Sequence, residues 1–329
     1  MEKADFRAQA LAALATRLSP NDEPFLEAAL DDRSQAVRAE AARLLARLPT
    51  SALAGRMRER ADRLLGYTPH KRGLFRAVAQ AFSGNAARGD LAVILPETLD
   101  LSWQRDGIEP KPRAGIGERA WWLLHALAAV APGHWSARFA ASPTELVAAA
   151  KGHEWGQAVL EGWTRAAITA RDGAWVPPLW HYWVDLRAQQ QGVQGPMPEL
   201  LRRLLDTMSR DRLVVVALES LGESTRAERP LWIDLAPLLP TPWDPALGRR
   251  YLEATRERLR SFRTKYNDPW LSTLEIAARA LPPETFVQAR ADWQIPEGLH
   301  RSPHEWQRHL ARFTTTIALR QQLMKEIAP

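Results

Sequence analysis

Short stretches with one apolar face recur along this chain. Between residues 34 and 48, the apolar residues Val37, Ala41, Leu44, Leu45 and Leu48 recur at the three- and four-residue spacing of one helix face. The same pattern predicts helices over 5–18, 23–30, 34–48, 50–65, 143–170, 174–190, 197–209, 211–221, 245–264, 270–280, 283–291 and 303–327, with another beginning at Glu118. The one strand-like run, 213–218, lies within an uninterrupted helical pattern. We therefore predict an all-α fold.

Proline and glycine interrupt this pattern at one place above all. Residues 91–117 form the longest irregular stretch, which carries Pro96, Gly107, Pro110 and Gly117. Loops of this length in compact proteins are usually functional or mobile. We therefore divide the chain into helix pairs over 1–90, an irregular loop over 91–117, and continuing helical repeats over 118–329. The scaffold is expected to be continuous, with any seam at the loop.

The segment from Asp32 to Arg38, followed by Ala41, Leu44 and Leu45, resembles the second-helix signature of HEAT repeats. A single pair of such helices cannot cover its own apolar face, so several pairs must stack to form a core. The resemblance implies a HEAT-like α-solenoid, an α–α superhelix.

Three longer segments resemble an uncharacterised bacterial family of HEAT-like proteins. They are DEPFLEAALDDRSQAVRAEAARLLARLPTSALAGRMRER at 22–60, GERAWWLLHALAAVAPGHW at 117–135 and EWGQAVLEGWTRAA at 154–167. The chain is similar to the C-terminal two-thirds of such proteins. The resemblance implies a neighbourhood of AAA-type ATPases, von Willebrand A-domain proteins and a SWIM zinc-finger protein. It supplies no catalytic residue and no cofactor.

Composition excludes several classes of chemistry. The 329 residues include no cysteine, which rules out disulfides, thiolate zinc sites, iron–sulfur ligation and cysteine nucleophiles. The longest apolar run, Trp121 to Ala131, is far shorter than the roughly 20 residues that cross a bilayer. The N-terminus is a charged amphipathic helix without the features of a signal peptide. We expect a cytoplasmic protein with no membrane partner.

A net charge of +6 raises the question of nucleic acid binding. The basic residues are nearly all arginine and alanine is abundant, a bias that a GC-rich genome also produces. The most basic local stretch places Arg249, Arg256, Arg260 and Arg263 on one helical stripe. This stripe is our candidate site for anions or an acidic partner. The alternative that we favour is a solvated face on which Glu253 pairs with Arg249 and Arg256.

Histidine offers little support for a metal site. His304 and His309 lie five residues apart, about 140° out of phase on a helix, whereas a zincin helix needs histidines four apart on one face. We therefore assign no metal ligand and no cofactor.

Tryptophan is frequent, with 14 in all. Aromatic rings can stack on nucleobases. However, Trp155 and Trp163, and likewise Trp175 and Trp183, are eight residues apart on one helix face, which is the pattern of helix packing. We interpret most of them as core residues.

Asp106 and Asp172 both occur in an Arg-Asp-Gly triplet. Aspartate before glycine is first of all a turn signal. An aspartate beside tryptophans in a basic groove would also suit the alkylpurine DNA glycosylases, which are built from HEAT-like repeats. That comparison is an analogy between folds alone.

Two functions follow as hypotheses. The first is a non-catalytic protein-interaction scaffold in an ATPase-containing bacterial system, with an AAA-type ATPase or a von Willebrand A-domain protein as partner. The second is a nucleic-acid-binding protein with glycosylase-like activity. The second requires that Arg249, Arg256, Arg260 and Arg263 converge with arginines of other helices beside exposed tryptophan.

Overall fold

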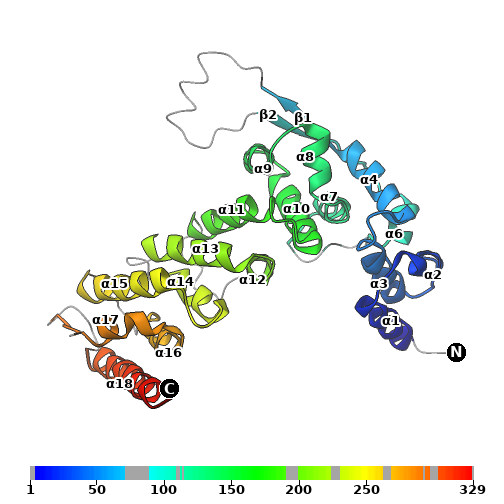
Figure 1. Cartoon of the computed structure of the whole chain (residues 1–329). Helices are drawn as coiled ribbons and strands as arrows, with labels where there is room; N and C mark the ends of the chain where they lie inside the picture. Colours follow the sequence, from blue (N-terminus) through cyan, green and yellow to red (C-terminus); the bar gives the residue numbers. More distant parts are fainter. Residues whose placement is uncertain are drawn as a thin grey trace. The chain divides into compact units, whose positions relative to one another are not determined.

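The protein is mostly helical (Figure 1). The computed structural model describes residues 4–70, 89–108, 112, 115–189, 199–223, 230–261, 268–291, 293–296 and 303–327. The chain forms two compact units, one made of Met1–Gln191 and Glu199–Thr207 and the other of Gly192–Pro198 and Met208–Pro329. No helix in the described ranges combines the length and apolar character needed to cross a membrane.

The first unit consists of short helices that pack on neighbours in the sequence. Its α-helices are α1 (Ala4–Ala13), α2 (Glu23–Ala29), α3 (Gln35–Leu45), α4 (Ala52–Leu64), α6 (Leu101–Arg105), α7 (Glu118–Ala128), α8 (Gly133–Phe139), α9 (Pro143–Lys151), α10 (Gly156–Ala170), α11 (Val176–Gln189) and α12 (Glu199–Leu205). Short 3-10 turns at Leu14–Thr16 and Pro20–Asp22 join α1 to α2. The amphipathic stripe of α3 is buried, as its sequence predicts.

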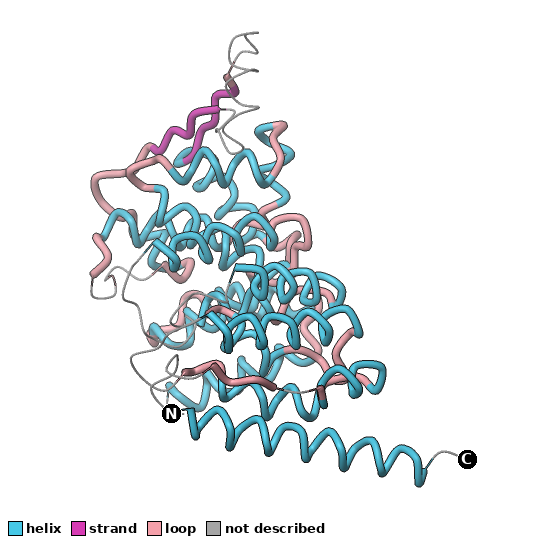
Figure 2. Tube along the Cα trace, turned by 90° about the vertical axis from the view of Figure 1, so that its left-hand side faces the viewer, coloured by secondary structure: helices cyan, strands magenta, loops and turns pink. Residues whose placement is uncertain are grey.

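A small antiparallel sheet, which sequence analysis missed, lies in this unit. Strand β1 (Leu65–Pro69) pairs with β2 (Gly89–Val93), and both strands are magenta in Figure 2. A Cβ atom at Gly89 would lie 2.4 Å from Cζ of Tyr67, so the two strands meet closely only because this residue is glycine. The sheet escapes a periodicity search because each strand is short and its partner lies about 20 residues away.

The stretch that was expected to be irregular, 91–117, contains two regular elements, the end of β2 and helix α6. Both pack back onto the first unit, since β2 contacts α9 and Arg105 on α6 binds Asp31. The division between the units falls instead near residues 191–208. Residues 109–111, 113 and 114 of the stretch lie outside the described residues.

The helix predicted over 143–170 is two helices, α9 and α10. The chain turns between them at His153–Trp155, and the amide of Gly156 donates to the carbonyl of His153. A Cβ atom at Gly156 would lie 2.0 Å from the carbonyl oxygen of Ala150, so only glycine allows this turn. Helix α10 then packs along α7.

The second unit holds the remaining described helices. They are α13 (Arg210–Glu223), α14 (Trp232–Leu235), α15 (Pro245–Ser261), α16 (Leu271–Ala280), α17 (Phe286–Arg290) and α18 (Pro303–Ile327), with 3-10 turns at Ala236–Leu238 and Pro283–Thr285. Its core is aromatic: Tyr251 on α15 contacts Trp232, Trp243 and Trp270, with ring centroids 5.4 to 6.0 Å apart. This cluster positions α15 and α16, against which the C-terminal helices pack.

Candidate functional site

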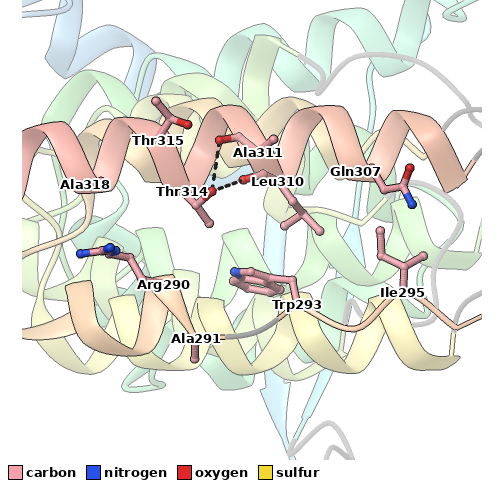
Figure 3. Close-up of a pocket in the computed structure, with 10 residues that line it drawn as sticks. All are labelled: Arg290, Ala291, Trp293, Ile295, Gln307, Leu310, Ala311, Thr314, Thr315 and Ala318. Atoms are coloured by element: carbon pink, nitrogen blue, oxygen red, sulfur yellow. Dashed lines mark hydrogen bonds between the residues drawn. The ribbon is translucent and has the colours of Figure 1, made fainter.

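A groove runs beside α18 in the second unit and has a volume of about 540 Å³. Figure 3 shows Trp293 and Ile295 pointing toward α18, from which Leu310 points back at them. The described residues that line the groove are Arg290, Ala291, Trp293, Ile295, Gln307, Leu310, Ala311, Thr314, Thr315 and Ala318. We call it the first groove.

The first half of α18 is anchored by one apolar stripe. Trp306, Leu310, Phe313 and Ile317 recur at helical spacing and are all buried. They pack against α16 and α17, and the neighbouring face of the helix forms a wall of the first groove. On this face, the hydroxyl of Thr314 donates to the carbonyls of Leu310 and Ala311 in the preceding turn of the same helix. The wall is therefore a regular helix surface.

Trp293 is held in place from three directions. Its indole Nε1 donates to the carbonyl of Ala289 at 3.0 Å, and its ring meets Phe313 of α18 edge-on at 5.9 Å. The guanidinium of Arg256 lies 4.5 Å from the ring centroid. A half-buried tryptophan fixed in this way presents a rigid aromatic surface to the groove. Sequence analysis did not single out Trp293, although it follows a predicted helix and stands close to Pro296.

Arg256, from the candidate arginine stripe, helps to hold Trp293 in place. Its Nη2 donates to the carbonyl of Gln288 at 2.5 Å, so it joins α15 to α17 while covering Trp293. Burial, together with the nearby charge of Arg260, lowers the pKa of Arg256 below its ordinary value. The side chain is thus engaged within the fold.

The other arginines of the stripe have different surroundings. Arg249 and Arg260 are exposed on α15, and Arg263 lies outside the described residues. The ion pair expected between Glu253 and its neighbours runs to Arg250, at 3.7 Å. Arg258, which the stripe did not include, is buried and binds Asp268. The structure therefore brings Arg256 and Arg260 close together but gives them different roles.

A second groove of about 490 Å³ lies on another side of α18, toward α16. Its lining carries the ionisable side chains of Glu275, Arg279, His309 and Arg312, with Thr315, Thr316 and Phe313 between them. Glu275 accepts a hydrogen bond from Arg279 on the same helix. Basic groups therefore outnumber acidic ones along this second groove.

The described side chains that line the first groove are mostly uncharged. Arg290 is the one ionisable side chain among the described residues that line it, and its Nη1 donates to Oε1 of Gln321 at 2.9 Å. Amide, hydroxyl and guanidinium groups around an apolar floor can bind a polypeptide through hydrogen bonds and buried aromatic surface.

Most tryptophans are core residues, as predicted. Those that are buried are Trp121, Trp122, Trp135, Trp163, Trp175, Trp180, Trp232, Trp243, Trp270 and Trp306. Trp183 is half-buried and its Nε1 donates to the hydroxyl of Thr164. Trp155 is also half-buried and lies under the guanidinium of Arg119.

The two candidate histidines, His304 and His309, have different surroundings. His304 is exposed, and its Nδ1 is 3.2 Å from the side-chain oxygen of Gln307. His309 lines the second groove. Among the described residues, no group of three or more His, Asp or Glu side chains could hold a metal ion.

Both Arg-Asp-Gly aspartates lie in turns, as predicted. Asp172 Oδ1 accepts from the amide of Ala174 just before α11. Asp106 ends α6, and the following Gly107 has a φ of +91°, which glycine adopts readily.

Asp106 is buried in a cluster of arginines that joins α2, α4 and α6. Arg60 and Arg56 lie 2.6 and 2.9 Å from its carboxylate, and Arg56 also binds Glu27. Burial alone would raise the pKa of Asp106, but its hydrogen bond to Arg56 and the charge of Arg60 more than offset this, so the pKa is lowered. A carboxylate held ionised in this way is a structural link between helices.

Comparison with known proteins adds one relationship. A family model described as a family of unknown function (DUF5691) matches residues 1–327. Neither a curated protein nor a solved structure matches the chain.

Proposed function

Because the chain belongs to the DUF5691 family, whose function is unknown, we propose its role from its geometry: a non-catalytic protein-interaction scaffold. The scaffold is built from HEAT-like helix pairs. In the first unit, helices contact others at most a few elements away, such as α2 with α3 and, most extensively, α7 with α10. In the second unit, α17 and α18 pair in the same way. Nearest-neighbour contacts of this kind are what a helical repeat array requires.

The observation that carries the proposal is the fixed tryptophan of the first groove. Trp293 is held by Ala289, Phe313 and Arg256, and it remains half-buried beside a helix wall. Tryptophan and arginine dominate the binding energy of protein interfaces, above all where the rings are held in advance. The groove therefore suits a helical or extended segment of a partner protein, whose apolar side chains would cover Trp293, Ile295 and Leu310.

Within each unit, arginine side chains link neighbouring helices and loops. Arg7 joins α1 to Asp32, Arg105 joins α6 to Asp31, and Arg256 joins α15 to α17. Each of these arginines bonds to a group on another element of its unit. Their placement supports shape complementarity as the mechanism, without a reaction.

The partner that we propose is a cytoplasmic AAA-type ATPase or von Willebrand A-domain protein. This part of the proposal rests on the resemblance of residues 22–60, 117–135 and 154–167. The groove adds a requirement of its own: the docking segment should carry an acidic or amide group near Arg290.

The test measures binding of the full chain to purified AAA-type ATPase and von Willebrand A-domain proteins from the same organism. Thr314→Arg fills the first groove and should weaken binding at least about tenfold, since it displaces the buried segment. Thr169→Arg is the matched control, because Thr169 on α10 also bonds to the carbonyl four residues earlier. It should bind like the unmodified chain.

Failure of both partners to bind the unmodified chain would overturn the proposed partner, and equal binding by the two variants would exclude the groove. Binding to single- and double-stranded DNA at two salt concentrations tests the other hypothesis. Salt-sensitive DNA binding that Arg260→Glu abolishes would replace the scaffold proposal with nucleic acid recognition.

A further inference from the structure

Helix α18 changes character after Ile317. The first half buries its apolar stripe, whereas Leu319, Leu323 and Ile327 are 57%, 44% and 77% exposed. These three residues are four apart and follow one ridge of the helix, with Met324, also exposed, beside them. The C-terminal turns of α18 continue past the neighbouring helices of the second unit (Figure 2). An apolar ridge on an extended helix end marks an interaction surface.

The same outer face has a different composition earlier in the helix. Ala311 and Thr315 continue the ridge toward the N-terminus of α18 with small side chains. Arg312 lies on this face and also lines the second groove, together with His309 and Arg279. At the far end, Glu326 stands fourteen residues after Arg312, so both project from the same side of the helix as Leu319.

We propose that this face binds the α18 helix of a second copy of the chain, antiparallel, across a two-fold axis at Leu319. Residues equidistant from Leu319 then meet. Ala311 faces Ile327 of the second copy, Thr315 faces Leu323, and Arg312 faces Glu326. Small side chains receive large ones, and a cation receives an anion at each end of the contact.

The face is complementary to itself, which is the reason for choosing a second copy as the occupant. Its apolar residues lie at the centre and toward one end, with basic groups at the other end and Glu326 opposite them. Antiparallel pairing satisfies both charged ends at once, as an isologous interface requires. Parallel pairing would place Arg312 against Arg312 and Glu326 against Glu326.

The face proposed for pairing shares Ala311 and Thr315 with the first groove, but the two contacts can be tested separately. The first groove uses Gln307, Thr314 and Ala318, which lie about 120° around α18 from Arg312, Leu319 and Glu326. The pairing of two copies therefore covers the first groove at Ala311 and Thr315 and leaves open the side formed by Gln307, Thr314 and Ala318. Thr314→Arg changes the first groove alone and should weaken partner binding, whereas Leu319→Glu changes the outer face alone and should weaken dimerisation.

The first experiment is sedimentation equilibrium of the full chain over a range of concentrations. The unmodified chain should be a dimer, and Leu319→Glu should be a monomer because it places two carboxylates together at the two-fold axis. Val287→Glu is the control, since Val287 is an exposed apolar residue on α17 and should leave the dimer intact. Circular dichroism checks that each variant folds. A monomeric unmodified chain at every concentration would refute the pairing.

Charge reversal tests the register. Arg312→Glu and Glu326→Arg should each weaken dimerisation about tenfold, because each puts like charges together at both ends of the contact. The double variant Arg312→Glu/Glu326→Arg should restore the dimer. Lys325→Glu makes a comparable change about 100° around the helix from Glu326 and should have no effect. A double variant no tighter than the single ones would disprove the antiparallel arrangement.

Discussion

Arg258 and Asp268 form an ion pair inside the second unit. Nε of Arg258 lies 2.8 Å from the carboxylate of Asp268, and the two side chains are 0% and 1% exposed. The same carboxylate accepts a hydrogen bond from the amide of Trp270, and the guanidinium lies 5.4 Å from the centroid of the Trp270 ring. The pair therefore links α15 to the start of α16 within the aromatic core.

Removing one member of this pair should destabilise the second unit strongly. Asp268→Ala leaves a buried guanidinium without its counter-charge, and we expect a loss of about 3–5 kcal/mol in the free energy of unfolding. Urea denaturation measures it. Glu275→Ala, which breaks an exposed pair with Arg279, should cost no more than about 1 kcal/mol. Similar losses in the free energy of unfolding for the two variants would mean that the buried pair stabilises the unit no more than the exposed pair does.

Two arginines on α15 should respond differently to the same substitution. Arg256→Gln removes the hydrogen bond to Gln288 and the contact with Trp293, so it should destabilise the second unit by about 1–2 kcal/mol. Arg260→Gln changes an exposed side chain and should have little effect. Thermal unfolding compares the two. If Arg260→Gln proves the more damaging variant, the role assigned to Arg256 is wrong.

Two helical glycines should give opposite results when replaced by alanine. A Cβ atom at Gly162 on α10 would lie 2.8 Å from Cβ of Leu127 and 2.9 Å from the carbonyl oxygen of Leu124, so Gly162→Ala should force α7 and α10 apart. We expect a loss of about 1–3 kcal/mol. At Gly55 on α4 nothing lies within 4 Å, and Gly55→Ala should stabilise the first unit by about 0.5–1 kcal/mol. If both variants shifted the urea midpoint of the unmodified chain in the same direction, this packing would be contradicted.

The stability of the first unit should depend on pH through Asp106. The lowered pKa means that the native state favours the ionised carboxylate more than the unfolded state does. The contribution of Asp106 is therefore complete above its ordinary pKa of 3.8 and is lost as the pH falls through the lower native value. Unfolding measured as a function of pH should show this loss.

Asp106→Asn should remove part of that acid dependence, and it should also weaken the unit at neutral pH because Arg56 and Arg60 lose their shared partner. Asp185→Asn, which removes an exposed carboxylate paired with Lys151, should leave the dependence unchanged. If the Asp106→Asn chain loses stability at low pH in the same way as the unmodified chain, then other carboxylates cause the acid dependence.

Most helix positions followed from the sequence because periodicity is a local property, whereas the short helices α6, α8 and α14 were not predicted. Val37, Ala41, Leu44 and Leu45 lie on one face of α3 by their spacing alone, and that face is buried. The break at Gly156 was missed because a glycine inside an apolar pattern does not reveal how closely Ala150 approaches it. The β1–β2 sheet was missed because strand pairing depends on a partner elsewhere in the chain.

For the candidate arginine stripe too, the sequence supplied one part of the description and the tertiary structure the other. By itself, the sequence determined that Arg249, Arg256 and Arg260 share a helical stripe, because a helix repeats every 3.6 residues. Only the tertiary structure decided that Arg256 covers Trp293 and binds Gln288 while Arg249 and Arg260 stay exposed. The groove beside Trp293 could also be found only in the tertiary structure. Its walls come from segments about 20 residues apart, and their contact depends on packing, which leaves no local pattern in the sequence.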